Sequence, residues 1–171
     1  MTIHRFFRIT ALLSFVLFLL LTGSVRGASG LSLYIPAIPG DGTTNSIDIL
    51  SFSFGVSKVG ANANWQDLNL QKALDSSSSP LMFDCAMGTT LNNVVLTYID
   101  SNGKPAYTIT MNNVTVTSYQ LGGASGGGPP TESFSLHFLN IQWTYQKYDG
   151  VGNPIGPPIT HTWDVNAGSG T

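Results

Sequence analysis

The stretch IDILSFSFGV, residues Ile47–Val56, alternates between apolar and polar side chains with a period of two. This period is typical of a β-strand with one face in the core and the other in water, and it favours a fold built from sheets. The apolar residues of one parity, which we expect in the core, are Leu50, Phe52 and Phe54. The serines of the other parity, Ser51 and Ser53, are expected on the opposite, exposed face.

Further β segments follow along the chain. Asn93–Ile99 and Tyr107–Met111 predict two strands joined by a hairpin, because Asn102-Gly103 between them supplies the positive φ angles of a tight turn. Three more segments with strand patterns are Val114–Tyr119, Phe134–Phe138 and Ile141–Tyr145. The apolar parity shifts between Phe138 and Ile141, which indicates a bulge or a strand that changes its covered face. The pattern predicts an antiparallel β domain, either a barrel or a sandwich.

One short helix is expected between the serine run at residues 76–79 and Gly88. Ser79 suits the helix cap, Pro80 suits the first helical position, and Gly88 suits a left-handed stop. The residues that helical spacing places on the inner side are Leu81, Met82 and Cys85. We therefore expect a single helix packed on the sheets.

The first 27 residues have the three-part layout of a secretory signal peptide. A basic start is followed by the apolar run Ala11–Leu21 and by small and polar residues up to Gly30. A membrane anchor is the alternative, but a span needs about 20 apolar residues and this run is shorter. We expect cleavage between Gly27 and Ala28, no lipid because no cysteine lies nearby, and a secreted or periplasmic protein without a stable membrane anchor. Residues 28–171 then form one domain.

The composition of residues 28–171 excludes some classes of function. Four lysines and no arginine stand against nine acidic residues, a net charge of about −5. This charge lacks the cationic surface that nucleic-acid backbones require. Cys85 is the only cysteine, so no intramolecular disulfide can form and stability has to come from a buried core.

The sequence offers no recognisable catalytic chemistry. His137 and His161 have no partner at metal-ligand spacing, the carboxylates are dispersed, and no serine nucleophile motif is present. We expect no catalytic residue, no cofactor and no metal, and therefore not an enzyme. The three tryptophans could line a sugar-binding face, although such aromatic residues more often fill a core or an interface. They are Trp65, Trp143 and Trp163.

Four stretches carry a resemblance to a known family. They are LYIPAIPGD at 33–41, IDILSFSFGVS at 47–57, WQDLNLQKALDSSSSPLMFDCAMG at 65–88 and HTWDV at 161–165. In this order and spacing they resemble the Hcp family, the haemolysin-coregulated tube proteins of type VI secretion systems. The resemblance implies a small antiparallel β-barrel of two packed sheets with one short α-helix. It also implies a homohexameric ring, with rings that stack into a tube and are secreted as effector carriers.

The resemblance implies partners as well: further copies of the chain, and the sheath, spike or effector proteins of a type VI system. A monomeric secreted β-sandwich that binds a carbohydrate or a protein is the alternative function. The mass in solution separates the two.

Two loops and one strand face are candidate sites under this resemblance. Residues 118–138 contain five glycines and two prolines between two strand patterns. Glycine allows close backbone approach, which suits a subunit contact, whereas the alternative is a flexible linker. The candidate interface residues are Gly122, Gly123, Ser125, Gly126 and Gly127, with Gly60 and Asn62 in a second, short loop. In a ring, Ser51 and Ser53 would face the lumen, and in a monomer they would face ordinary solvent.

Overall fold

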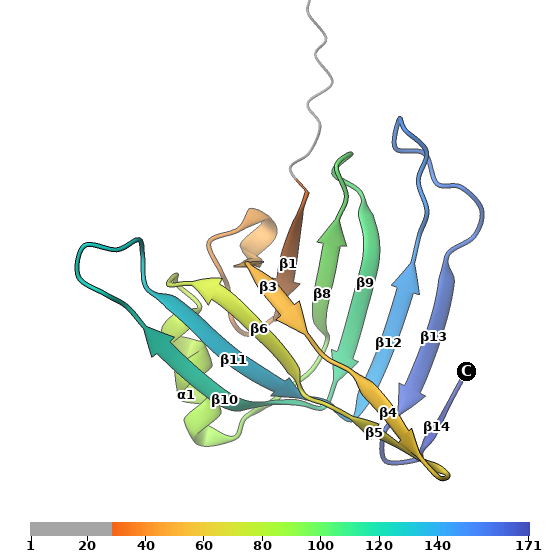
Figure 1. Cartoon of the computed structure of the whole chain (residues 1–171), viewed down its shortest axis with the longest axis horizontal. Coiled ribbons are helices and arrows are strands. Elements are labelled where there is room, and N and C mark those ends of the chain that lie inside the picture. The colour runs from red at the N-terminus through yellow and green to blue at the C-terminus, as the bar shows by residue number, and fades with distance from the viewer. Residues whose placement is uncertain (1–28) are drawn as a thin grey trace, which may run out of the picture.

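A computed structural model of the chain describes residues 29–171 (Figure 1). The strands in this range are β1 (Gly30–Tyr34), β2 (Ile47–Ile49), β3 (Ser51–Ser53), β4 (Val56–Val59), β5 (Asn62–Trp65), β6 (Leu68–Ala73), β7 (Thr90–Leu91), β8 (Val94–Ile99), β9 (Pro105–Asn112), β10 (Val114–Gly122), β11 (Thr131–His137), β12 (Asn140–Tyr145), β13 (Ile159–Asp164) and β14 (Ser169–Gly170). The helices are a 3-10 turn (Thr43–Asn45) and α1 (Ser78–Met87). The expected signal peptide lies outside the described residues.

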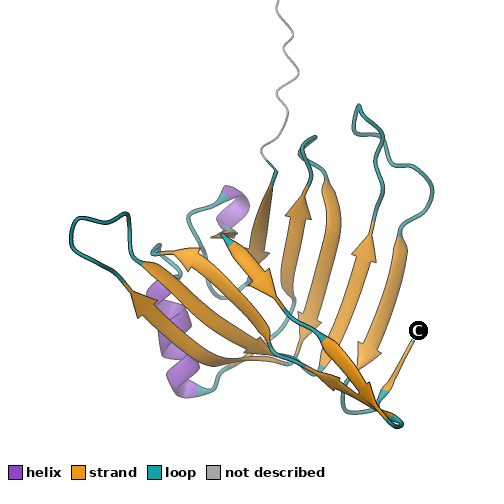
Figure 2. Ribbon diagram, in the orientation of Figure 1, coloured by secondary structure: helices purple, strands orange, loops and turns teal. Residues whose placement is uncertain are grey.

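The strands of residues 29–171 form two antiparallel sheets and a separate β4–β5 hairpin (Figure 2). The large sheet has seven strands in the order β14-β13-β12-β9-β8-β1-β2, and the small sheet has five in the order β3-β6-β11-β10-β7. Side chains of both sheets meet in one apolar core, where Leu96, Ile109, Leu70 and Phe134 are at most 2% exposed. This confirms the predicted mainly β fold of two packed antiparallel sheets with one short α-helix.

The segment Ile47–Val56 is broken into short strands that belong to different sheets. Its first part, β2, pairs with β1 in the large sheet, and β3 pairs with β6 in the small sheet. Ile47 and Ile49 are buried, whereas Leu50, at the crossing, is 61% exposed. A chain that passes between two packed sheets turns over, so the parity that meets the core shifts at the crossing. The prediction that Leu50 lies in the core is therefore wrong.

The same reasoning explains the parity shift between Phe138 and Ile141. Strand β11 ends at His137 in the small sheet and β12 begins at Asn140 in the large sheet. Both Phe138 and Ile141 are buried, each at 2% exposure, because the chain changes sheet between them. The shift reflects a crossing and not a bulge within one strand.

The predicted β8–β9 hairpin is present, with a different turn. Only Gly103 has a positive φ angle, 72°, whereas Asn102 does not belong to the residues with positive φ. The Asp100 carboxylate accepts hydrogen bonds from the N–H groups of Asn102 and Lys104, at 2.8 and 2.9 Å. A side-chain acceptor thus stabilises a turn that we had expected to depend on the dipeptide alone.

Helix α1 ends as predicted and begins earlier. Gly88 terminates it with φ of 67° and an N–H bond to the Asp84 carbonyl. Ser77, rather than Ser79, occupies the cap position. The inner side of the helix carries Leu81, which is fully buried, but Met82 is 47% exposed and does not share that side. Within residues 29–171 no helix is long and apolar enough to cross a membrane.

Candidate functional site

The outer face of the small sheet is covered by neutral polar side chains. Strand register places them in two rows of four, Ser51–Gln71–Ser133–Gln120 and Ser53–Asn69–Ser135–Ser118. Neighbours in these rows bind one another: the Ser51 hydroxyl donates to Gln71 at 3.0 Å, and the Ser135 hydroxyl donates to Asn69 at 2.7 Å. We call these eight residues the polar face. It offers hydroxyl and amide groups for hydrogen bonds, and the charged residue nearest to its rows on the same side of the sheet is Asp67, which is paired with His137.

The expected lumen residues Ser51 and Ser53 both belong to the polar face and are exposed. Phe52, between them, is half-buried and packs against the core, as does Phe54. The polar face therefore includes the two serines and continues from them across four strands. Sequence reasoning identified only two of its eight members. The pattern of one strand does not show which strands lie beside it, so the order β3-β6-β11-β10 could not be predicted.

A cluster of Asp67, Thr117 and His137 lies on the same outer side of the small sheet, at one end of the polar face. The Thr117 hydroxyl donates to Asp67 Oδ2 at 2.6 Å, and His137 Nδ1 lies 3.0 Å from Asp67 Oδ1. The histidine side chain is 47% exposed. The threonine hydroxyl donates to the carboxylate and not to the imidazole, so this arrangement does not prepare a nucleophile for catalysis.

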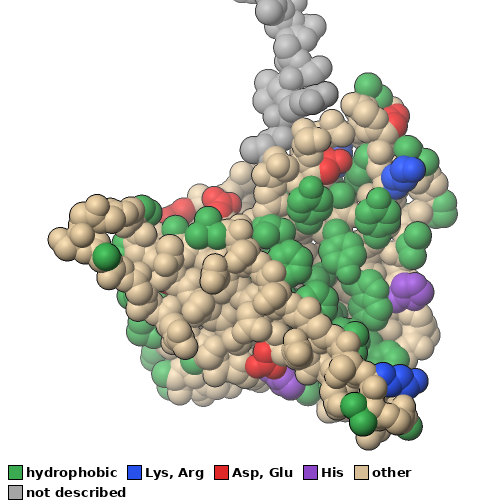
Figure 3. All heavy atoms as spheres, in the orientation of Figure 1, with side chains coloured by type: hydrophobic (Ala, Val, Ile, Leu, Met, Phe, Trp, Pro, Cys, Tyr) green, Lys and Arg blue, Asp and Glu red, His purple; other side chains and the backbone are tan. Residues whose placement is uncertain are grey.

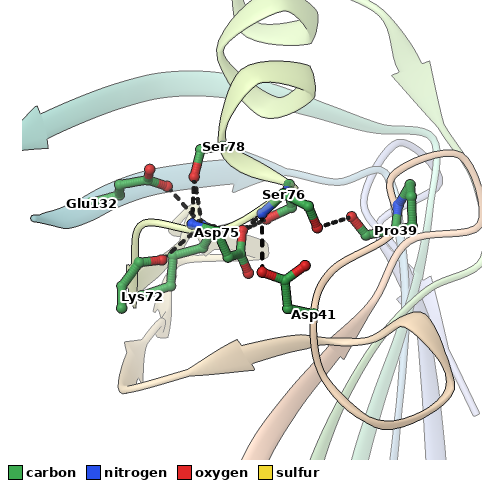
Figure 4. A network of polar contacts seen from close by, with 9 residues as sticks. Pro39, Asp41, Lys72, Asp75, Ser76, Ser78 and Glu132 are labelled. Carbon is green, nitrogen blue, oxygen red and sulfur yellow. Dashed lines mark hydrogen bonds and ion pairs between the residues drawn. The ribbon is translucent and has the colours of Figure 1, made fainter. Parts of the chain in front are cut away.

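A buried ionic network ties α1 to the small sheet (Figure 4). Lys72 Nζ lies 2.8 Å from Glu132 and 2.7 Å from Asp75, and it donates to the Ser78 hydroxyl at 3.0 Å. The Lys72 and Glu132 side chains are both 0% exposed. Because two charges this deep in the protein are tolerated only when paired and hydrogen-bonded, the network holds β6, β11 and the start of α1 in one arrangement.

The network also shifts the pKa values of its neighbours. Burial raises the pKa of Asp75, but hydrogen bonds from Lys72 and Ser77 outweigh this effect and hold the pKa below its usual value. Burial, followed by the neighbouring Glu132 carboxylate, raises the pKa of Tyr119 to about 12. The lowered pKa keeps Asp75 ionised beside the Lys72 ammonium, and the raised pKa keeps Tyr119 neutral beside the Glu132 carboxylate.

The glycine-rich loop, residues 123–130, connects β10 to β11 and projects from one end of the molecule (Figure 1). Gly126 has φ of +79°, and a Cβ at Gly122 or Gly126 would meet nothing within 4 Å. The β4–β5 hairpin, with Gly60 at its tip and Asn62 at the start of β5, projects from the opposite end. Within one chain these loops are exposed, so their role in a subunit contact stays a prediction.

The three tryptophans form one cluster where the β4–β5 hairpin meets strands β12 and β13 of the large sheet. Trp65 is its centre, with ring centroids 5.7 Å from Trp143, 6.4 Å from Trp163 and 5.9 Å from Phe138. All three tryptophans are half-buried and pack against the core. This arrangement fits core filling better than a sugar-binding platform. Across the described residues, no three His, Cys, Asp or Glu side chains come together to hold a metal ion.

Comparisons with known proteins agree on one family. A family model described as "Type VI secretion system effector, Hcp" matches residues 37–145. Protein hcp1 of Pseudomonas aeruginosa is 31% identical over 105 residues, which are 60% of this chain and 65% of that protein. The chain thus matches slightly less than two thirds of the length of this relative.

Solved structures share the fold. A structure described as "Structure of a type six secretion system protein" has a TM-score of 0.77 at 21% identity and covers 84% of this chain and 100% of its own. Hcp1 from Salmonella typhimurium has a TM-score of 0.73 at 20% identity, covering 84% of this chain and 99% of its own. A type VI secretion system effector from Yersinia pestis has a TM-score of 0.68 at 21% identity, covering 79% of this chain and 99% of its own.

Proposed function

We propose that this chain, which belongs to the Hcp family of type VI secretion effectors, forms homohexameric rings that stack into a tube. We further propose that the rings are secreted and carry effectors in their lumen. The role is structural and non-catalytic, with sheath, spike and effector proteins as partners of the ring. The observation that carries the proposal is the polar face, in a fold whose family match extends over 109 residues.

The chemistry of the polar face suits the wall of a tube. Its eight side chains are neutral, and neighbours such as Ser51 and Gln71 or Ser135 and Asn69 hydrogen-bond one another. A cargo protein that contacts this face would exchange one set of hydrogen bonds for another. The net gain of such an exchange is about 0.5–1.5 kcal/mol for each bond. A charged wall would instead retain cargo of the opposite sign and exclude cargo of the same sign.

The mass of residues 28–171 in solution tests the ring. Light scattering at micromolar concentration should give about six times the chain mass, and negative-stain images should show closed rings. A single monomeric species at all concentrations would contradict the ring and favour the alternative of a secreted binding module. Binding of a carbohydrate or protein ligand by that monomer would then identify the second function.

The proposed route of export is a cleaved signal peptide, residues 1–27. Its basic, apolar and small-residue segments motivate this proposal. N-terminal sequencing of the released protein should read from Ala28, and intact mass should show no lipid. A released protein that still begins at Met1 would contradict cleavage without affecting the ring proposal.

A further inference from the structure

The side of the large sheet that faces away from the core carries a hollow lined by hydrogen-bonding side chains. Ile109, Met111 and Ile141 point into the core, so their neighbours in β9 and β12 point outward. Strand register places these neighbours beside residues of β13 and of the chain end in two rows, Asn112–Asn140–Asp164–Ser169 and Thr110–Gln142–Thr162–Thr171. The hollow over these rows has a volume of about 440 Å³, within the roughly 300–1,000 Å³ of small-molecule sites.

Strand β14 forms one wall of the hollow. It pairs with β13 at the edge of the large sheet (Figure 1). A Cβ atom at Gly170 would collide with the Thr162 carbonyl oxygen and would lie 2.7 Å from the Trp163 ring. Only glycine therefore allows β14 to lie this close to β13, and this close pairing holds Ser169 and Thr171 at the rim.

An amide and a carboxylate lie side by side at the centre of the hollow. Asn140 Nδ2 donates to Asp164 Oδ2 at 3.0 Å. A second bond fixes each group: Asn140 Oδ1 accepts from Asn113 Nδ2 at 3.0 Å, and Asp164 Oδ1 accepts the Ala167 N–H at 2.8 Å. A carboxylate has about four lone-pair sites and an amide has two N–H donors, so the pair keeps both acceptors and a donor for a ligand. Groups that are already held in place lose little freedom on binding.

Other side chains of the two rows add hydrogen-bonding capacity. Among the described residues, those of Thr110, Gln142 and Ser169 form no hydrogen bond to another group, unlike Thr162, whose hydroxyl lies 2.7 Å from that of Thr171. Gln142 and Ser169 are exposed at the rim. The next row on the same side of the sheet continues the hydroxyl surface with four threonines, Thr97–Thr108–Thr144–Thr160.

This lining disfavours charged and apolar ligands. Asp164 is the only charged residue of the lining, which contains no Lys, Arg or His, so a phosphate, sulfate or carboxylate group would be repelled. An apolar ligand would leave the polar groups without partners. Apolar surface lies instead on the other side of the large sheet, where Figure 3 shows hydrophobic side chains gathered between its strands and the small sheet with its β4–β5 hairpin.

A neutral sugar matches the lining. Each sugar hydroxyl both donates and accepts hydrogen bonds, so two adjacent hydroxyls fit an amide donor beside a carboxylate acceptor. The threonine methyl groups offer apolar contacts to the C–H groups of the ring. We propose that the hollow binds a neutral carbohydrate through Asn140, Asp164 and Gln142, and that the threonine row contacts further units of the same glycan. Hydrogen-bonding groups, and not the tryptophan cluster, hold the sugar.

The inference goes beyond the proposed tube, because the hollow lies on the large sheet and the polar face lies on the small sheet. A ring would present one hollow for each copy. Several weak sites on one particle strengthen attachment to a surface that displays many copies of a glycan.

A printed array of neutral and acidic glycans tests the proposal. Residues 28–171 are labelled at their lysines, none of which lines the hollow. Neutral glycans should bind and acidic ones should not. The glycan that binds most strongly is then titrated in free form, with saturation-transfer NMR as the readout. Gln142→Ala should weaken its binding by about fivefold, the usual effect of one lost hydrogen bond, and Asp164→Asn should weaken it further because a charged acceptor bonds more strongly.

The matched control is Gln120→Ala, which makes the same change at an exposed glutamine of the polar face. This variant should bind the glycan like the unmodified protein. Binding to no neutral glycan, binding to acidic glycans only, or binding unchanged by Gln142→Ala would each overturn the proposal. Loss of binding in Gln120→Ala would overturn it as well, because the sugar would then lie on the polar face. Light scattering on the same samples tests the ring separately, so a monomer that binds glycan through the hollow would contradict the ring and support this site.

Discussion

Replacing Lys72 by methionine should strongly destabilise the protein. The Lys72 ammonium is completely buried and contacts Glu132, Asp75, Ser78 and the Ala73 carbonyl within 3.0 Å. Methionine fills a similar volume, so the main effect is an uncompensated carboxylate at Glu132, which is also completely buried. Breaking a buried pair in this way costs about 3–5 kcal/mol, a large share of the roughly 5–15 kcal/mol that stabilises a domain.

Urea unfolding at pH 7, followed by tryptophan fluorescence, measures this loss. The matched comparison is Lys72→Met combined with Glu132→Gln, which removes both charges and should recover most of the stability of the unmodified protein. A single Lys72→Met variant that loses less than about 1 kcal/mol would refute the reasoning, because the buried charge would then be solvated or neutralised at little cost. A double variant as unstable as the single one would show that Asp75, and not Glu132, is the partner that matters.

Four further predictions concern the core, the polar face, the glycine-rich loop and the effect of pH. Phe134→Ala should cost about 3–5 kcal/mol because Phe134 is 1% exposed, whereas Ser53→Gln should leave stability and ring mass unchanged and alter only cargo binding. Gly126→Val should weaken ring assembly because φ at this position is +79°, and unchanged rings would favour a flexible linker. The folded pKa of Asp75 lies below its unfolded value, so its contribution to stability is present above about pH 4 and is lost as pH falls; Asp75→Asn should flatten the urea stability profile between pH 5 and 3.

The sequence was most informative where local chemistry determines structure. Gly88 ended α1 because a left-handed stop needs no tertiary partner. The strand patterns of β8, β9 and β10 were found for the same reason, since alternation reports burial of one face. The alternation of apolar and polar residues gave the wrong burial for Leu50. The chain passes from one sheet to the other at this residue, and which sheet it joins depends on distant strands.

The sheet crossings did leave a signal that was missed. LNNV at 91–94 and MNNV at 111–114 both mark places where the chain passes between the sheets. Asn93 and Asn113 have φ of 55° and 51°, and each donates its N–H to an asparagine side chain of the other crossing, Asn112 and Asn92. Asparagine tolerates this backbone conformation better than other residues with a side chain. Two repeated Asn-Asn pairs between strand patterns therefore indicate paired corners.

The buried network shows a different limit. Lys72 and Glu132 are 60 positions apart in the chain and face each other only because β6 pairs with β11. Each residue alone is typical of a solvated surface, so composition could not place the pair in the core. Strand pairing, which is the least local property of the fold, decides where these charges lie.

The two sides of the small sheet differ in chemistry. Its outer side carries mainly neutral hydrogen-bonding groups, and its inner side carries Leu68, Leu70, Phe134 and Leu136, which are at most 1% exposed. Burial of the inner side stabilises the fold, and it leaves the outer side chains free to meet water and, in the proposed tube, cargo. Strand β3 shows both sides at once, because Phe52 packs against the core whereas Ser51 and Ser53 are exposed on the polar face. A substitution at Phe52 should therefore act on stability, and a substitution at Ser53 should act on what the outer side can bind.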